Sequence, residues 1–123
     1  MPTRSETGRK VYVTNLGFHD YTPAKRYGDI IPCTRGNLDI RHTDRVEAEL
    51  QSVLAGSEDE DFLLISGHPL IVALCVGYWF RLHRTINILY WDPLVGDYLL
   101  RPTEFASKVE QIEMLLGESE FTE

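Results

Sequence analysis

Features that would assign a function directly are scarce in this sequence. Its 123 residues include only two cysteines, Cys33 and Cys75, which form no CxxC pair and lie among apolar neighbours. We expect both to be buried thiols in a reducing compartment, and without histidines at finger spacing they form no zinc site. The longest apolar run, residues 70–80, is too short to cross a bilayer. We therefore expect no metal site and no membrane span.

Positive charge is also in short supply. The chain has 12 Lys and Arg against 19 Asp and Glu, for a net charge of −7, which argues against binding to duplex nucleic acid. The imbalance is uneven, because residues 1–45 carry a net charge of +3 and residues 46–123 carry −10. The first part could meet an anionic ligand locally, although ordinary solvated side chains explain the same balance.

Catalytic and targeting motifs are missing as well. The sequence contains no Walker-type loop, dinucleotide fingerprint, nucleophile elbow or readable carboxylate pair. It therefore does not require an enzyme, and we expect no cofactor. Residues 1–10 are polar with no apolar centre, which is not typical of a secretory signal. We expect a cytoplasmic protein.

The composition that remains is that of a folded domain. Hydrophobic residues make up 43% of the chain and aromatic residues 11%, which is enough for a core without disulfides or metals. We predict a disordered N-terminal arm over residues 1–9, a single α/β domain over residues 10–117 and an acidic tail over residues 118–123.

Strand and helix patterns alternate along this domain. Apolar and β-branched runs predict strands, and N-cap residues followed by apolar residues at helical spacing predict helices. The expected strands are residues 10–14, 29–33, 62–65, 85–91 and 97–101, with a further extended piece at 38–40. The expected helices begin at the caps Thr22, Thr43 and Thr103 or at Pro69, and cover residues 22–27, 43–55, 69–83 and 103–116.

This alternation predicts a compact three-layer, Rossmann-like α/β fold. The sheet is mostly parallel, has four or five strands with helices on both faces, and ends in an antiparallel hairpin strand. Pro32 places the second strand at an edge, and residues 57–61 form an acidic surface loop. The helix over 69–83 is apolar nearly all round, so we expect it to be deeply packed.

The last helix and the edge strand are the free apolar surfaces of so small a domain. The helix places several apolar side chains on one side: Phe105, Val109, Ile112, Leu115 and Leu116. A symmetric dimer is the commonest way to cover such surfaces. We therefore expect a homodimer.

Ligands of open α/β sheets bind beyond the carboxyl ends of the strands. Polar residues follow every expected parallel strand, so their convergence is the strongest functional signal in the sequence. The predicted ligand-binding residues are Asn15, Arg35, Ser66, Gly67, His68, Trp91 and Asp92.

The Ser66-Gly67-His68-Pro69 turn is the sharpest feature among these residues. Gly67 would admit a ligand close to the backbone, and Ser66 and His68 could hydrogen-bond a phosphate beside the positive end of the following helix. If a cyclic nucleotide is cleaved, His68 is the residue we expect to act as the general acid. Equally, Ser66 and His68 could only cap the helix while Gly67 makes the turn.

The other strand ends leave similar alternatives. In the loop over residues 15–21, His19 and Asp20 could form an acid–base pair or be ordinary loop polarity, while Phe18 and Tyr21 could stack on a base or cover the core. Arg35 suits a phosphate, although salt bridges explain the basic residues near it equally well. The Trp91-Asp92 pair is either a stacking wall with a hydroxyl acceptor or a hairpin corner.

Several segments of the chain resemble small tailed-phage and prophage proteins of unknown function. The resemblance implies a phage-encoded protein and no particular reaction. It rests on residues 21–36 (YTPAKRYGDIIPCTRG), 42–45 (HTDR), 64–68 (LISGH) and 87–92 (NILYWD).

Two shorter segments resemble the viral anti-CRISPR ring nucleases. These are small α/β proteins that bind and cleave cyclic tetra-adenylate. Residues 10–15 (KVYVTN) are similar to their opening strand, and His68 is similar to a histidine that they place before a helix. This resemblance implies binding of a cyclic nucleotide.

Two functional hypotheses follow from the sequence. The first is a small phage-encoded protein that binds a nucleotide or cyclic nucleotide at the carboxyl edge of its sheet, for use in counter-defence in the host cytoplasm. The alternative is a non-enzymatic, acidic interaction protein that docks on a host or phage protein.

Overall fold

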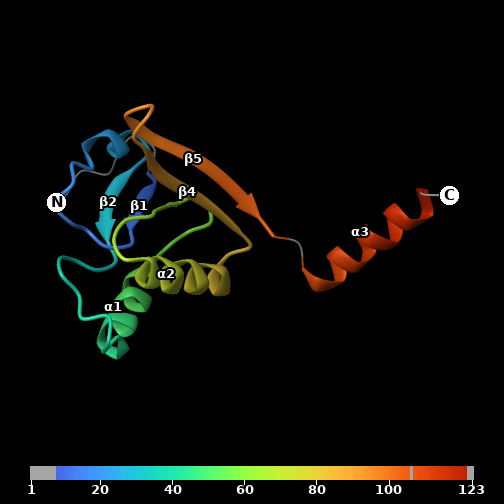
Figure 1. Ribbon diagram of the computed structural model, residues 1–123, viewed down its shortest axis with the longest axis horizontal. Helices are drawn as coiled ribbons and strands as arrows, with labels where there is room; N and C mark the ends of the chain where they lie inside the picture. Colours follow the sequence, from blue (N-terminus) through green and yellow to red (C-terminus); the bar gives the residue numbers. More distant parts are fainter. Residues whose placement is uncertain (1–7, 106, 122–123) are drawn as a thin grey trace.

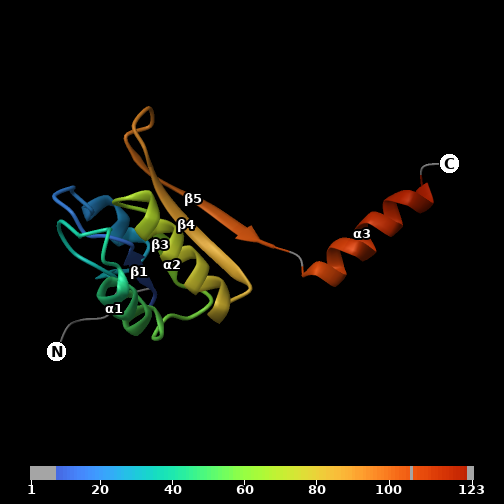
Figure 2. The same cartoon turned by 60° about the horizontal axis from the view of Figure 1, so that its bottom comes forward.

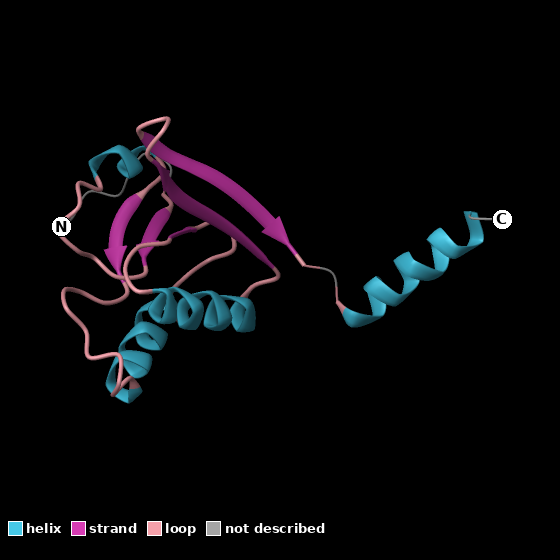
Figure 3. Cartoon of the chain, viewed as in Figure 1, coloured by secondary structure: helices cyan, strands magenta, loops and turns pink. Residues whose placement is uncertain are grey.

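The computed structural model describes residues 8–105 and 107–121, so most of the predicted N-terminal arm lies outside the described residues. Five strands, a short 3-10 helix and three α-helices follow one another along the chain (Figures 1 and 3). In chain order they are β1 (Lys10–Val13), η1 (Thr22–Arg26), β2 (Asp29–Pro32), α1 (Asp44–Leu54), β3 (Phe62–Leu64), α2 (Pro69–Leu82), β4 (Thr85–Asp92), β5 (Asp97–Glu104) and α3 (Lys108–Phe121).

The five strands form one sheet in the order β2-β1-β3-β4-β5. The first four run parallel, with Val11 opposite both Ile30 and Phe62, and β5 returns antiparallel to β4. This confirms the predicted α/β fold class, including the hairpin at its carboxyl end. It also confirms β2 as an edge strand.

Each face of the sheet carries its own apolar core. On one face, α1 and α2 pack over Tyr12, Leu63 and Ile86. On the other, η1 and the loop before it cover alternate strand residues such as Val11 and Leu64. Helices thus lie on both faces, but unequally, because a five-residue 3-10 helix is the main cover of the second face. That thinner layer leaves room for a cavity.

The two cysteines lie in the core beneath α1 and α2, as the sequence predicts. Cys33 and Cys75 are free thiols with no exposed surface. A hydrogen bond with Cys75, followed by burial, raises the pKa of Cys33 well above its usual range. The thiol therefore stays protonated and acts as an apolar core group.

Tyr12 of β1 lies at the centre of the same core. It is almost completely buried, and its ring contacts the edge of Trp79 with 6.2 Å between the centroids. Burial, with a smaller effect of the Asp61 carboxylate, raises the pKa of the phenol to about 12.

Tyr12 makes the stability of the fold sensitive to alkali. Because an unfolded tyrosine ionises near pH 10, its contribution is intact below that pH and is lost as the pH rises toward 12. We expect the free energy of unfolding to fall by about 2–3 kcal/mol over that interval. Urea denaturation from pH 9 to 12 measures this loss, and Tyr12→Phe should abolish most of it. An unchanged pH dependence in Tyr12→Phe would contradict the assignment.

The predicted N-caps are only partly correct. Thr43 directly precedes α1, but its hydroxyl donates to the Glu47 carboxylate rather than accepting from a backbone N–H. Thr22 is the first residue of η1, not its cap, and its N–H donates to Asp20 Oδ1 at 2.9 Å. The extended piece expected at residues 38–40 forms no strand, because the chain turns there around the Asp39 side chain.

The acidic loop over residues 57–61 is not a uniformly exposed surface. Asp61 is 97% buried, since it accepts the N–H groups of Lys10 and Glu58 and so joins the loop to β1. Asp59 Oδ1 lies 2.5 Å from Nδ1 of the buried His83, whose Nε2 lies 2.7 Å from Ser57 Oγ. The Ser57 hydroxyl donates to Leu54 O at 2.6 Å, so its single proton is engaged there. This Ser-His-Asp chain ties the loop to the end of α2.

The expectation that α2 is deeply packed is wrong. Only Ile71, Cys75 and Trp79, one stripe of the helix, are buried. Leu70 and Leu82 are 40% and 42% exposed, and Ala73 and Gly77 are exposed as well. A helix that is apolar all round needs neighbours on every side, and the described residues supply them on one side only.

The last helix begins later than predicted. Thr103 belongs to β5, which continues to Glu104, and Ser107 caps α3 instead. The Ser107 hydroxyl accepts the N–H of Glu110, whose carboxylate accepts the N–H of Ser107, a reciprocal capping box. The helix continues to Phe121 and so includes part of the predicted acidic tail. It projects away from the sheet and from the other helices (Figures 1 and 2).

No helix in residues 8–105 and 107–121 is both long enough and apolar enough to cross a membrane.

Candidate functional site

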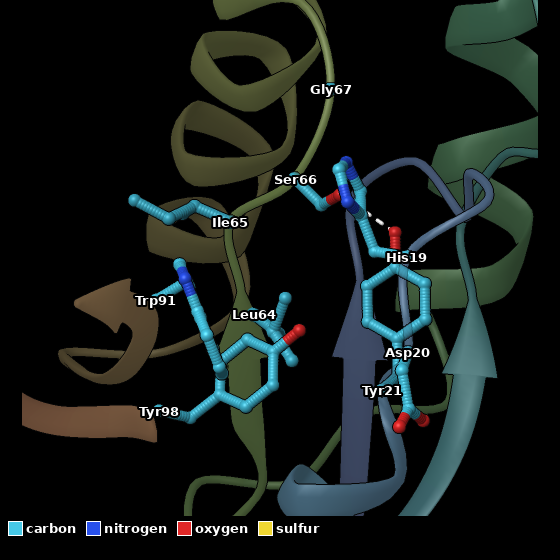
Figure 4. A pocket seen from close by; sticks show the side chains of 9 residues that line it. All are labelled: His19, Asp20, Tyr21, Leu64, Ile65, Ser66, Gly67, Trp91 and Tyr98. Carbon is cyan, nitrogen blue, oxygen red and sulfur yellow. Dashed lines mark hydrogen bonds between the residues drawn. The ribbon is translucent and has the colours of Figure 1, made fainter. Parts of the chain in front are cut away.

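A cavity of about 450 Å³ opens at the carboxyl edge of the parallel strands, on the face covered by η1 (Figure 4). Its residues come from the loop after β1, from the end of β3 and the turn after it, and from the β4-β5 hairpin. They are His19, Asp20, Tyr21, Leu64, Ile65, Ser66, Gly67, Trp91 and Tyr98. Its size falls in the range of about 300–1,000 Å³ that is usual for small-molecule sites.

Hydrogen bonds between the ends of β1 and β3 form the rigid inner end of this cavity. The Thr14 hydroxyl donates to Ser66 O at 2.5 Å and accepts the Ser66 N–H at 2.8 Å. The Ser66 hydroxyl lies 2.9 Å from the Tyr21 hydroxyl, which also accepts the N–H of Gly17. The orientation of Ser66 is therefore fixed before any ligand binds.

Aromatic rings line two sides of the cavity. Trp91 and Tyr98 lie directly opposite each other across the β4-β5 ladder, with ring centroids 5.1 Å apart. His19 and Tyr21 meet edge to face at 6.2 Å. Figure 4 shows Trp91 and Tyr98 on one side and His19 and Tyr21 on the other, with Ser66 between them. Such walls suit a planar ring better than a compact charged group.

The cavity carries little charge. Its one carboxylate is that of Asp20. A hydrogen bond with the Thr22 side chain, followed by one from the Thr22 N–H, holds the pKa of this carboxyl below its usual range. The nearby guanidinium of Arg26 donates to both oxygens of Asp97 and to Tyr98 O. Because those bonds tie η1 to β5, Arg26 is committed to the fold. Among the described residues, no group of three or more His, Cys, Asp or Glu could hold a metal ion.

Gly67 lies at a close approach of two loops. Its φ is +95°, and a Cβ atom at this position would lie 2.7 Å from the Cβ of Asn15. Asn15 cannot retreat easily, because its Nδ2 donates to Gly36 O and its Oδ1 shares the proton of the Thr34 hydroxyl with Thr14 O. The turn after β3 therefore requires glycine.

The structure brings some of the predicted site residues together and separates others. Ser66, Gly67 and Trp91 line the cavity. Asn15 lies behind Gly67 and, with Gly67 and His68, borders a shallower depression on the side of α1 and α2. Arg35 is exposed beyond β2, bridged to Leu16.

Asp92 lies at the corner of the β4-β5 hairpin. Its carboxylate accepts the N–H groups of Leu94 and Val95. These contacts favour the hairpin-corner interpretation for Asp92 over a role as a hydroxyl acceptor.

His68 caps α2. Its Nδ1 accepts the N–H of Leu70 at 3.0 Å, so a neutral ring carries its proton on Nε2. We expect His68→Ala to lower the free energy of unfolding by about 0.5–1 kcal/mol, the usual value of a helix N-cap.

His68→Asn supplies another acceptor at the N-cap and should recover most of this loss. Urea denaturation of the two variants gives the comparison. Equal stabilities for His68→Ala and His68→Asn would show that the cap contributes nothing.

The sequence did not point to every residue of the cavity. The loop over residues 15–21 suits stacking or acid–base roles, but the predicted ligand-binding residues do not include His19 and Tyr21. The predicted residues also do not include Tyr98, the second residue of β5 after the hairpin turn. Residues 91 and 98 are an odd number of positions apart, so alternation along the sequence alone does not place their rings on one face. The rings share a face because Asp92 pairs with Asp97, which sets Trp91 opposite Tyr98.

Together, the fold and this cavity define a small α/β protein with an aromatic-walled cavity, lined by a single carboxylate, at the carboxyl edge of a mostly parallel sheet. Residues 6–105 match the family described as phage Pam3 gp32-like protein, and the chain belongs to this family. The resemblance to small phage proteins is thereby confirmed. Searches of curated proteins and of solved structures give no match.

Proposed function

We propose that this phage protein binds a nucleotide or cyclic nucleotide, with a base inserted between the aromatic walls of the cavity. The observation that carries the proposal is the pair of facing walls, Trp91 with Tyr98 and His19 with Tyr21, at the edge where open α/β sheets bind ligands. Stacking of a base on an aromatic side chain contributes about 1–3 kcal/mol.

The polar groups of the cavity suit the edge of a base. The Tyr21 hydroxyl is engaged with Gly17 N–H, Asn15 O and the Ser66 hydroxyl, whereas the Ser66 hydroxyl keeps further capacity to bond a ligand. Burial raises the pKa of Tyr98, so that its phenol stays neutral. A largely apolar site whose one charged group is the Asp20 carboxylate would bind the uncharged part of a nucleotide and leave its phosphates outside.

The phosphates would lie toward Gly67 and the first turn of α2. Gly67 has no side chain to block the approach. Since the first-turn N–H groups of α2 are bonded to His68, it is the helix dipole that would favour negative charge there. His68 could reach only a ligand that extends past Gly67 into the neighbouring depression. Cleavage by His68 is therefore a separate step, which binding in the aromatic cavity does not require.

Binding alone would be sufficient for a role during infection. A phage protein that sequesters a cyclic nucleotide in the host cytoplasm would withdraw a signal from the host's defence. We propose this counter-defence role as the use of the cavity.

Titration with nucleotides tests the proposal. Trp91 is 47% exposed and lines the cavity, whereas Trp79 is fully buried, so a stacked base should quench the fluorescence of Trp91 alone. The panel would comprise mononucleotides, cyclic dinucleotides and cyclic oligoadenylates. A ligand at 100 times its Kd should also stabilise the protein by about 2.7 kcal/mol in thermal melting.

A matched pair of variants then locates the site. Trp91→Ala should weaken the best ligand by about 10- to 100-fold, because a stacking partner is lost. Phe18→Ala should leave the affinity unchanged, since Phe18 is a fully exposed aromatic residue in the same loop region and does not line the cavity. If no nucleotide changes the fluorescence or the melting temperature, the proposal is wrong.

The alternative function is docking on a host or phage protein. The tip of the β4-β5 hairpin favours it, because Leu94 and Val95 expose apolar side chains at 98% and 61%. Affinity capture from infected cells would return a stoichiometric partner, and a Leu94→Asp, Val95→Asp double variant should lose that partner. Capture that is unchanged in the double variant would exclude the hairpin tip.

A further inference from the structure

The α3 helix presents an apolar face with no neighbour among the described residues. Four of its side chains, at helical spacing, fall within about a third of the helix circumference. These are Val109, Ile112, Leu115 and Leu116, each about half to two-thirds exposed. A helix that projects into solvent with such a face needs a partner to bury it.

The α2 helix carries an apolar groove that also lacks a cover. It runs along the exposed side of the helix and is lined by Ile65, Ser66, Gly67, Pro69, Val72, Ala73, Val76 and Gly77. None of these residues is charged, and the small residues Ala73 and Gly77 leave the exposed side of the helix free of bulky side chains. The sequence predicts burial nearly all round α2, and this is the side that the described residues leave uncovered.

The groove and the helix complement each other. Both α2 and α3 have 14 residues, so each is about 21 Å long. The residues of α3 carry a net charge of −3. Two exposed arginines, Arg81 at the end of α2 and Arg101 on β5, flank the same side of the sheet as α2. The acidic helix and these cations have opposite charges.

Contacts at the first turn of α3 direct the helix away from its own groove. Arg84 Nη2 donates to Glu110 Oε1 at 2.9 Å, and the Phe80 and Phe105 rings lie 5.3 Å apart. With its first turn held there, the helix extends outward in both views of the molecule (Figures 1 and 2). Docking into its own α2 would require breaking the Arg84–Glu110 ion pair.

We propose that α3 of each chain seats in the α2 groove of a second copy, so that two chains exchange helices in a two-fold symmetric dimer. A two-fold symmetric dimer contains this helix-in-groove contact twice. Each copy of the contact therefore needs to bury only about half of the 1,200–2,000 Å² of surface that stable interfaces bury. The dimer covers both apolar surfaces at once and completes the layer that is open beside α2.

Measurement of mass with matched charge variants is the first test. Light scattering of the full chain should give twice the monomer mass of 14.1 kDa. Ala73→Glu should weaken the dimer by about 100-fold or more, because an unpaired carboxylate would be buried in the groove. Ala48→Glu, on the exposed face of α1, should leave it intact. A monomer in the unaltered chain at high concentration would overturn the proposal.

If Ala73→Glu does not fold, Ile112→Asp with Leu116→Asp gives the same test from the other side. Those side chains lie on the projecting helix and contribute nothing to the core. The double variant should remain folded by circular dichroism and become monomeric. A double variant that remains dimeric would overturn the role of α3.

Cross-linking identifies the seat. We mix two variants that carry tags of different length, one with Ala73→Cys and one with Ile112→Cys. The mixture is treated with a short bis-maleimide, which joins two nearby thiols. The native Cys33 and Cys75 should not react, because both are buried. A cross-linked band containing one chain of each kind supports the exchange. The pair Ala48→Cys with Ile112→Cys should give none. A single chain with both Ala73→Cys and Ile112→Cys that cross-links only internally would show that α3 folds back on its own groove.

Discussion

Substitution of Gly67 by alanine is expected to destabilise the protein by about 3 kcal/mol, because it combines backbone strain with overpacking. The backbone at Gly67 has a φ of +95°, which an alanine adopts only with strain. The new methyl group would also lie 2.7 Å from the Cβ of Asn15, which its bonds to Thr34 and Gly36 hold in place. Urea denaturation should show the full loss.

Gly36→Ala separates the two causes. Gly36 also has a positive φ, +71°, but a Cβ atom there would meet nothing within 4 Å. We expect a cost of about 1–2 kcal/mol from strain alone. If Gly67→Ala and Gly36→Ala cost the same, the close contact between Gly67 and Asn15 has no energetic weight.

Truncation of Trp79 to alanine should cost about 3–5 kcal/mol, the range for large aromatic residues in a core. Trp79 is fully buried between Tyr12 and His83, and its indole N–H donates to Thr85 O at 2.8 Å. The change leaves a cavity and an unpaired carbonyl where α2 meets β4. Since domains are stable by only about 5–15 kcal/mol, Trp79→Ala should melt far below the unaltered protein.

The second tryptophan provides the comparison. Trp91 is about half exposed and packs chiefly against Tyr98, so we expect Trp91→Ala to cost about 1 kcal/mol. Thermal melts of the two variants give the ranking. A Trp91→Ala variant as unstable as Trp79→Ala would mean that the cavity wall is part of the core, and its use as a binding test would fail.

Much of the fold could be predicted because its signals are local. The uninterrupted apolar run over residues 62–65 predicts a strand covered on both faces, and β3 is fully buried at the centre of the sheet. Pro32 predicts an edge, and β2 has one neighbour only. Alternation of strands and helices was enough to predict the parallel sheet, since parallel strands need long connections.

Two of the wrong expectations concern features that depend on distant residues. The hydropathy of α2 is the same whether or not another helix covers it, so the sequence predicts burial on all sides. The described residues bury only one side of the helix. Asp61 is acidic and lies in an acidic run, yet it is buried because Lys10 N–H, 51 residues away, requires an acceptor. The start of α3 was a local error, since Ser107 and Glu110 form a capping box that is readable in the sequence.

The candidate site shows the same division. The turn after β3 could be located from Ser66 and Gly67 because strand ends converge in this topology. Tyr98 could not, because its place opposite Trp91 depends on the register of the β4-β5 hairpin, which only the folded ladder defines.

The prolines on the two outermost strands have a consequence for how copies of this protein can meet. The N–H groups of Asp29 and Cys33 donate to Arg9 O and Val13 O, on the side of β1. Because backbone N–H groups alternate along a strand, the nitrogen of Pro32 faces the open edge, where proline offers no donor. At the opposite border, Pro102 removes a donor from β5. Edge-to-edge pairing of sheets, the first step of fibre growth, is thereby hindered at both borders. Concentrated solutions should stay free of cross-β aggregates, and self-association is left to the helices.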